Sequence, residues 1–226
     1  MNHNGEICMH RFQNRLASKT AQLLSVSLCF VLLALACHDP EMEARSQALA
    51  GQPAPAFTLP DSNGQTHSLS DFSGQLVVLE WVNFDCPYVR KHYESGNMQA
   101  LQERYTEQGV TWLMINSSAP GKQGNFEPAE INRRLAAHNA HPTAYLLDPD
   151  GTVGRSYGAK ATPHMYVIST EGKIVYQGAI DSIASTDQDD IAEADNYVDQ
   201  ALHAVMAGES PPVASTSAYG CSVKYL

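Results

Sequence analysis

The chain has 226 residues, of which 43% are hydrophobic, and it carries a net charge of −10 and five cysteines. This length suits one domain with appendages, and the apolar content argues against disorder over most of the chain. The acidic balance excludes a nucleic-acid-binding surface, because no basic stripe is present to neutralise phosphates. The cysteines are too few for a disulfide-dense scaffold.

The first 36 residues have the pattern of an export signal. Three basic residues lie within residues 1–20, and an apolar run of 14 residues, broken only by small serines, follows at 23–36. That run is shorter than the ~20 residues that a membrane-spanning helix needs. We therefore interpret residues 1–36 as a signal peptide and residues 37–52 as a tether.

Residues 33–37 (LALAC) resemble the lipobox of bacterial lipoproteins. The resemblance implies that a lipid on Cys37 anchors the mature protein to a membrane of the cell envelope, on its periplasmic side. Plain cleavage of the leader and an uncleaved anchor are the alternatives.

Residues 53–208 are predicted to form one α/β domain, because strand and helix patterns alternate along them and the central strands read as buried on both faces. The expected elements are a β-hairpin over 57–69, strands at 76–82, 110–115 and 145–147, helices at 87–108 and 128–138, a second hairpin over 165–176 and a last helix at 189–207. Seven carboxylates between residues 181 and 199 are interpreted as a solvated face. A tail at 209–226, flexible by composition, carries Cys221.

Cys86 is the residue that the sequence marks for chemistry. It follows a buried strand, and Pro87 stands where the first turn of a helix is expected. The N–H groups and dipole at a helix N-terminus favour a thiolate, and Arg90 and His92, one turn further on, are expected to add positive charge. A buried, inert cysteine is the alternative.

Thr162-Pro163, just before a later strand, is the second marked feature, because a proline there donates no ladder hydrogen bond and a cis bond would explain it. Cys86-Pro87-Tyr88-Val89 together with Thr162-Pro163 resembles the thioredoxin fold. The resemblance implies a three-layer fold with a central mixed sheet flanked by helices, extended by the N-terminal hairpin and the C-terminal tail. It also implies that a cis-proline packs beside the cysteine.

A larger set of motifs, spread over residues 52–226, resembles the redoxin (AhpC/TSA) superfamily in its peroxiredoxin-like branch. The shared pieces include Ile115-Asn116-Ser117, Tyr145-Leu146-Leu147-Asp148, Tyr157-Gly158, Gly172-Lys173-Ile174-Val175-Tyr176 and Gly220-Cys221-Ser222-Val223-Lys224. The chain departs from its relatives at Val89, which leaves no C-x-x-C, and at Asn83, where relatives carry a cysteine and peroxidases a hydroxyl. The resemblance nevertheless assigns Asn83 to the substrate-binding region.

The resemblance implies a thiol oxidoreductase in which Cys86 is the nucleophile and Cys221 a candidate resolving thiol, within one chain or across a homodimer. Peroxide and disulfides are the expected substrates, and a thioredoxin-like protein the expected reductant. Glu80, six residues before Cys86, corresponds to a buried carboxylate of thioredoxins. It is interpreted either as a proton relay to Cys86 or as an ion-pair partner of Arg90, since a carboxylate inside a buried strand is costly unless paired or neutral.

His164, directly after Thr162-Pro163, is expected to face the same pocket as Cys86 and to tune it. No cofactor and no metal are predicted. Two other functions remain open: thiol–disulfide exchange with exported proteins, and a non-catalytic or copper-delivery module that would use Cys86, His92 and His164.

Overall fold

The computed structural model describes residues 48–226, and every structural statement below concerns that part of the chain. The predicted signal peptide, Cys37 and most of the predicted tether lie outside the described residues.

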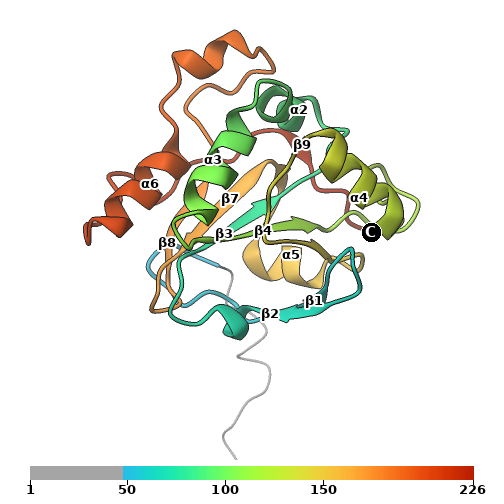
Figure 1. Cartoon of the computed structure of the whole chain (residues 1–226), viewed down its shortest axis with the longest axis horizontal. Coiled ribbons are helices and arrows are strands. Elements are labelled where there is room, and N and C mark those ends of the chain that lie inside the picture. The colour runs from blue at the N-terminus through green and yellow to red at the C-terminus, as the bar shows by residue number, and fades with distance from the viewer. Residues whose placement is uncertain (1–47) are drawn as a thin grey trace, which may run out of the picture. The chain divides into compact units, whose positions relative to one another are not determined.

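A five-stranded mixed sheet lies at the centre of the domain, in the strand order β5-β4-β3-β7-β8 (Figure 1). Its strands are β3 (Val77–Trp81), β4 (Thr111–Asn116), β5 (Ala144–Leu147), β7 (His164–Ile168) and β8 (Ile174–Gly178). Strands β3, β4 and β5 run parallel, whereas β7 is antiparallel to both β3 and β8. This mixed sheet, flanked by helices, is the thioredoxin-like arrangement that the sequence predicted.

Helices cover both faces of the sheet. They are α2 (Pro87–Glu94), α3 (Asn97–Thr106), α4 (Pro128–Ala137), α5 (Thr152–Tyr157) and α6 (Tyr197–Met206), with the 3₁₀ helices η2 (Leu69–Phe72) and η3 (Asp189–Ala192). In Figure 1, α5 and the N-terminal hairpin of β1 (Thr58–Pro60) and β2 (Thr66–Ser68) lie on the side of the sheet opposite to α2 and α3. The single helix expected over 87–108 is divided into α2 and α3 at residues 95–96.

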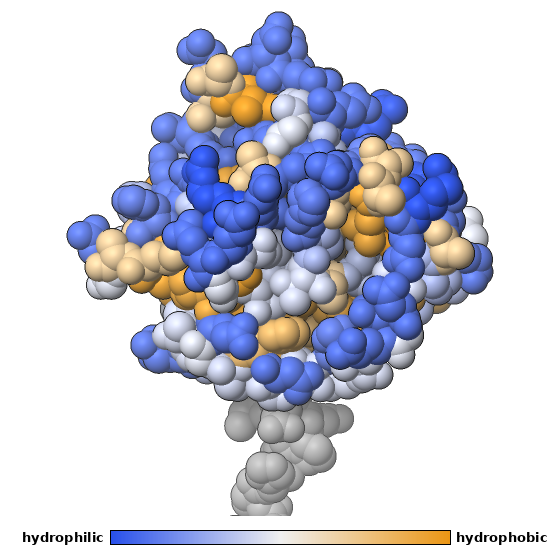
Figure 2. Space-filling view, in the orientation of Figure 1, coloured by the Kyte–Doolittle hydropathy of each residue, from blue (hydrophilic) through white to orange (hydrophobic). Residues whose placement is uncertain are grey.

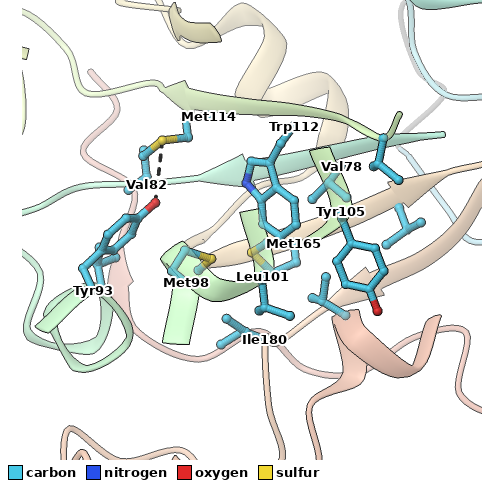
Figure 3. Packing of buried hydrophobic residues seen from close by; sticks show 14 of the residues in the cluster. Val78, Val82, Tyr93, Met98, Leu101, Tyr105, Trp112, Met114, Met165 and Ile180 are labelled. Atoms are coloured by element: carbon cyan, nitrogen blue, oxygen red, sulfur yellow. Dashed lines mark hydrogen bonds between the residues drawn. The ribbon is translucent and has the colours of Figure 1, made fainter. Parts of the chain in front are cut away.

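The first core fills the space between the sheet and helices α2, α3 and α6. Strand alternation directs Val78, Trp112 and Met165 to this face, where they meet Met98 and Leu101 of α3 (Figure 3). All five side chains are buried, and each contributes about 1.5–3 kcal/mol through the area it removes from water.

The second core is aromatic and lies under α5. Trp81 and Tyr166 extend from the sheet to Tyr157 of α5, with ring centroids 5.3 Å (Trp81 to Tyr157) and 5.3 Å (Tyr166 to Tyr157) apart. Helix α5 was not predicted from the sequence, because its six residues are too few to show a helical period.

The predicted last helix at 189–207 is wrong in its first half. Residues 189–192 form only the 3₁₀ turn η3, and α6 begins at Tyr197 after Asn196, whose side chain accepts the Asp199 N–H at 2.9 Å. The Tyr197 N–H also donates to Ile180 O, which ties this point to the end of β8. The sequence shows one continuous apolar helical pattern over 189–207. The Asn196 cap and the backbone hydrogen bond from Tyr197 to Ile180 make the helix begin in its middle.

The predicted flexibility of the tail is also wrong. Residues 214–216 bond to Gln177 at the edge of β8, and β9 (Cys221–Ser222) then pairs antiparallel with β6 (Ala161–Thr162). Figure 1 shows β9 near α2 at one end of the molecule. Composition favoured a mobile segment, but the unpaired backbone groups of two strands hold it in place.

The visible face of the domain is mostly hydrophilic, with apolar side chains in small separate patches (Figure 2). Among the described helices, none combines the length and the hydropathy needed to span a bilayer.

Candidate active site

Cys86 lies at the junction between β3 and α2, as the sequence predicted. It is the N-cap residue of α2, and Pro87 is the first helical residue. The Cys86 N–H donates to Asn83 O at 2.9 Å, and the Asn83 side chain accepts the Asp85 N–H at 3.0 Å. Asn83 therefore shapes the turn that presents Cys86, and its amide donates at 3.5 Å to Gln123 O.

The Thr162–Pro163 segment packs directly against this thiol. The Cys86 Sγ–H donates to Thr162 O at 3.0 Å, and Cys86 is 0% exposed. The Thr162–Pro163 peptide bond is cis, which confirms the expectation from the sequence.

Cys221 completes a pair of thiols in one chain. Strand β9 places Cys221 directly opposite Thr162, and the Cys221 thiol hydrogen-bonds to Cys86. Both cysteines are free thiols, and Cys221 is only partly buried. Two residues that lie 135 positions apart in the sequence are thus neighbours, and no second copy is needed to bring them together.

The pKa values of the two thiols shift in opposite directions. Burial alone would raise the pKa of Cys86, but hydrogen bonds from the Cys221 thiol, from Thr162 and from two backbone N–H groups bring that pKa below its ordinary value. Burial, the hydrogen bond and the charge of Cys86 raise the pKa of Cys221 to about 11. Cys86 is therefore the thiol of the pair that loses its proton first, and Cys221 the one that keeps it.

Gly220 permits the close approach on which this pairing depends. Its φ is +137°, and a Cβ built on it would lie 2.1 Å from Thr162 O. Only glycine fits this position, because any side chain would collide with the backbone that accepts the Cys86 thiol. The sequence signal was a lone glycine before Cys221, too weak to interpret without its neighbour in space.

A buried polar cluster fixes the tail on the other side of Gly220. The Tyr219 hydroxyl donates to Asp181, and Lys91 Nζ lies 3.3 Å from the same carboxylate. The side chains of Lys91 and Asp181 are 0% and 3% exposed. Tyr219 also packs edge-on against Tyr88 at 5.8 Å between ring centroids. Asp181 is thus not part of a solvated acidic face, as the sequence suggested, but the anchor of the tail.

Arg90 and His92, which were expected to add positive charge near Cys86, interact with other residues instead. His92 is fully buried, 2.9 Å from the Asn97 amide and 3.7 Å from Asp181, and burial lowers its pKa to about 4 despite the opposing charge of Asp181. It is therefore neutral at pH 7. Arg90 is exposed and lies 4.0 Å from Glu94. Neither residue is among the groups that lower the pKa of Cys86, because His92 carries no charge at pH 7 and Arg90 lies at the surface beside Glu94.

Glu80 is enclosed by three donors. Tyr93 donates to it at 2.8 Å, Trp112 at 2.9 Å and Gln102 at 3.2 Å. Figure 3 shows Tyr93 and Trp112 in this core, where the Tyr93 hydroxyl also points to Met114 sulfur. Burial raises the pKa of Glu80 to about 7, and the three hydrogen bonds oppose that rise only in part.

The predicted ion pair between Glu80 and Arg90 is wrong, since Arg90 lies at the surface. The predicted relay to Cys86 stays a prediction, because the hydrogen bonds of Glu80 all go to its three donors.

His164 is buried on the sheet face that carries Tyr166, 4.7 Å from that ring between centroids, and its Nδ1 lies 3.4 Å from Lys160 N. Burial lowers its pKa to about 4. The expected contact with Cys86 is absent from its interactions, because strand alternation sends His164 to the face opposite Met165.

Within residues 48–226, no group of three or more His, Cys, Asp or Glu side chains is arranged to hold a metal ion. The separate environments of His92 and His164 give the copper alternative no support.

Comparison with known proteins relates the sequence of this chain to one family and to several named proteins. The sequence model of the AhpC/TSA family matches residues 50–177. "Thiol-disulfide oxidoreductase ResA" of Geobacillus kaustophilus is 29% identical over 154 residues, which cover 62% of this chain and 86% of that protein. "Putative peroxiredoxin Rv2521" of Mycobacterium tuberculosis is 29% identical over 153 residues, covering 66% and 84%.

Two solved structures share the fold over most of the chain. A hypothetical protein of Sinorhizobium meliloti aligns with a TM-score of 0.66 at 22% identity, covering 80% of this chain and 96% of that one. An uncharacterized conserved protein of Geobacillus kaustophilus aligns with a TM-score of 0.67 at 24% identity, covering 79% and 93%.

The raised pKa of Glu80 predicts a pH-dependent stability. Between its ordinary value of 4.5 and about 7, the unfolded chain releases the Glu80 proton while the folded chain keeps it. At this site the unfolded state then binds fewer protons, so the contribution of Glu80 to the free energy of unfolding falls as pH rises through this window and levels off above it. His92 and His164, whose pKa values burial lowers to about 4, contribute with the opposite sign in both proteins. The test is therefore the difference: in urea unfolding at pH 4.5 to 8, the free energy of unfolding of the wild type minus that of Glu80→Gln should fall as pH rises toward 7.

Exposed Glu193 supplies the control, since Glu193→Gln should keep the wild-type pH profile. Parallel profiles for wild type and Glu80→Gln would show that Glu80 titrates normally. In the same variant, an unchanged Cys86 titration curve would exclude the relay.

Gly220→Ala should lift the tail from Thr162 while leaving Cys221 in the chain. The Cys86 pKa should then rise, because the hydrogen bonds from Cys221 are lost. The rate constant for alkylation of its fully ionised form should increase about tenfold, as one or two backbone hydrogen bonds worth ~1 kcal/mol each disappear. Iodoacetamide labelling as a function of pH measures both quantities.

Gly208→Ala is the matched control, because Gly208 also has a positive φ of +77° but nothing lies within 4 Å of an added Cβ. Equal labelling rates in the two variants would contradict the role given to Gly220.

Proposed function

The chain belongs to the AhpC/TSA family, and we propose that it is a thiol-dependent oxidoreductase that cycles between a Cys86–Cys221 dithiol and the corresponding disulfide. Cys86 is the nucleophile and Cys221 the resolving thiol. The observation that carries the proposal is the contact between a thiol of lowered pKa and a second thiol, both held at the cis Thr162–Pro163 segment.

Peroxide is the first candidate oxidant, because the fully buried Cys86 favours a small molecule that needs only a slight displacement of the tail. The Cys86 thiolate attacks one peroxide oxygen and the O–O bond breaks. The other oxygen takes a proton and leaves as water or an alcohol, and Cys86 becomes a sulfenic acid. Cys221 then attacks the Cys86 sulfur, the S–O bond breaks, and the hydroxide leaves as water with the Cys221 proton.

Exchange with a disulfide substrate is the second candidate, supported by the relatives named as thiol-disulfide oxidoreductases. Strand β9 shows that the backbone of Thr162 accepts an extended segment with a cysteine in register. In this reaction the Cys86 thiolate attacks a substrate sulfur, a mixed disulfide forms, and Cys221 releases the second substrate thiol. The Asn83 side chain, occupied by its own turn, supplies no hydroxyl for a peroxide and so favours this candidate.

The other site residues are proposed to position Cys86. Asn83 and Pro87 fix its place at the start of α2. The Thr162 carbonyl accepts the hydrogen bond of the Cys86 thiol, and Thr162 with Pro163 lies behind the docked strand β9. Glu80 remains a candidate proton relay to Cys86, although its own hydrogen bonds are with Tyr93, Gln102 and Trp112.

We also propose that the protein works at the cell envelope, tethered by a lipid on Cys37, with a thioredoxin-like protein as its reductant. The export pattern of residues 1–36 and the lipobox resemblance support this location.

Activity assays with cysteine variants test the proposed cycle. The wild type should consume hydrogen peroxide or reduce a protein disulfide over many turnovers with a dithiol reductant, and should form the Cys86–Cys221 disulfide under mild oxidation. Cys86→Ser should abolish turnover, whereas Cys221→Ser should stop after one equivalent. The two substrates assayed in parallel distinguish the two candidates. Full activity in Cys86→Ser would refute the nucleophile, and absence of the disulfide by mass mapping would refute the pair.

Intact-mass measurement of exported protein tests the anchor. The expected species begins at Cys37 and carries a lipid mass, and Cys37→Ala should yield protein without that mass. A wild-type species that lacks the lipid would contradict the anchor while leaving the cysteine cycle unaffected.

A further inference from the structure

The two sulfurs of the pair differ in how they can be reached from outside. Both cysteines touch the first hydrophobic core, but Cys86 is a 0% exposed member of it, whereas Cys221 on strand β9 packs against it and is only partly buried. We infer that, in the disulfide form, Cys221 is the sulfur that an external thiol attacks, and that the mixed disulfide with the reductant forms on Cys221. This inference rests on the proposed function, which supplies the Cys86–Cys221 disulfide.

The geometry of attack carries the inference. A thiolate attacks a disulfide sulfur from the side opposite to the bond that breaks, so access to that side decides which sulfur reacts. For Cys86, that side lies within the core and beside Val89 of α2, where no solvent reaches. For Cys221, it faces away from Cys86, toward the partly exposed surface of the tail.

The identity of the leaving group favours the same sulfur. Attack on Cys221 expels Cys86, and hydrogen bonds from Thr162 and from two backbone N–H groups stabilise the Cys86 thiolate. Attack on Cys86 would expel Cys221, whose pKa burial raises even without the charge of Cys86. Because a thiol of lower pKa leaves faster, Cys86 is the better leaving group.

The tail keeps Cys221 in this orientation from both sides. On one side, Tyr219 is bonded to Asp181. On the other, the Val223 N–H donates to Lys160 O at 3.1 Å, and Lys224 O accepts the Ala119 N–H at 2.9 Å. Cys221 therefore presents one fixed face to an incoming thiol.

The reaction balances for a dithiol reductant. One reductant thiolate bonds to the Cys221 sulfur, the Cys86–Cys221 bond breaks, and Cys86 leaves with the electron pair as a thiolate. The second reductant thiol then loses its proton and attacks the reductant sulfur of the mixed disulfide. Cys221 leaves and takes up a proton, so that two electrons pass from the reductant to the protein.

Trapping of the mixed disulfide tests the inference. The full chain is oxidised with one equivalent of hydrogen peroxide, the disulfide is verified by mass, and substoichiometric glutathione is added. The reaction is quenched within milliseconds by acid, alkylated and digested with trypsin. Arg90 and Lys173 separate the two cysteines into different peptides.

The expected product carries glutathione on Cys221 and the alkyl group on Cys86, with an excess of roughly tenfold or more over the opposite arrangement. In Gly220→Ala, which keeps both thiols but loses the fit of the tail, this preference should fall, whereas Gly208→Ala should retain it.

Glutathione mainly on Cys86, or evenly on both cysteines, would overturn the inference while leaving the thiol pair intact. Failure of the oxidised protein to contain the Cys86–Cys221 disulfide would instead overturn the proposed function, and the verification step reports that outcome separately.

Discussion

The site depends on the close approach of one backbone to another, at the point where Gly220 passes Thr162. A strand can lie this near only because the residue facing the Thr162 carbonyl has no side chain. That approach sets Cys221 opposite Thr162, and the register in turn brings the two thiols into hydrogen-bond contact. The hydrogen bonds from Cys221 that help to lower the pKa of Cys86 therefore depend on this contact.

The ion pair of Lys91 and Asp181, which anchors the tail, costs desolvation free energy because both groups are buried. Lys91 and Asp181 are charged groups removed almost entirely from water, and burial of such a pair is repaid only when the remaining donors and acceptors find partners. Here Lys91 also donates to Ile183 O at 3.1 Å, and Asp181 also accepts from Tyr219 and from the Ile183 N–H. We interpret this cluster as the feature that fixes a single position of the tail. A directional hydrogen bond to the buried ion pair allows one orientation of Tyr219, whereas an apolar contact would allow several.

Local signals in the sequence were sufficient to predict the fold and the part of the site formed by Cys86, Glu80 and Pro163. Cys86-Pro87 after an apolar strand, the proline before β7 and the carboxylate inside β3 are each visible in a short stretch of sequence. The remainder depends on partners that are distant in the chain. Asp181 was hidden in an acidic run because only its burial distinguishes it, and the composition of the tail indicated mobility because strand pairing leaves no periodic trace over two residues. The position of His164 next to Pro163 in the sequence suggests that it faces Cys86, but strand alternation directs it to the opposite face of the sheet, beside Tyr166.

In the proposed cycle, docking of the tail would also link the redox state of the protein to its folding. The fold gives the two thiols a high effective concentration for each other, and by reciprocity a Cys86–Cys221 disulfide would stabilise the docked tail by the same free energy. The reduction potential of the couple is therefore not set by the sulfurs alone. Contacts that seat Tyr219 on Asp181 make the disulfide harder to reduce, and changes that loosen them make the protein a stronger oxidant. Residues that touch neither cysteine thus act as the tuning elements of its electron transfer.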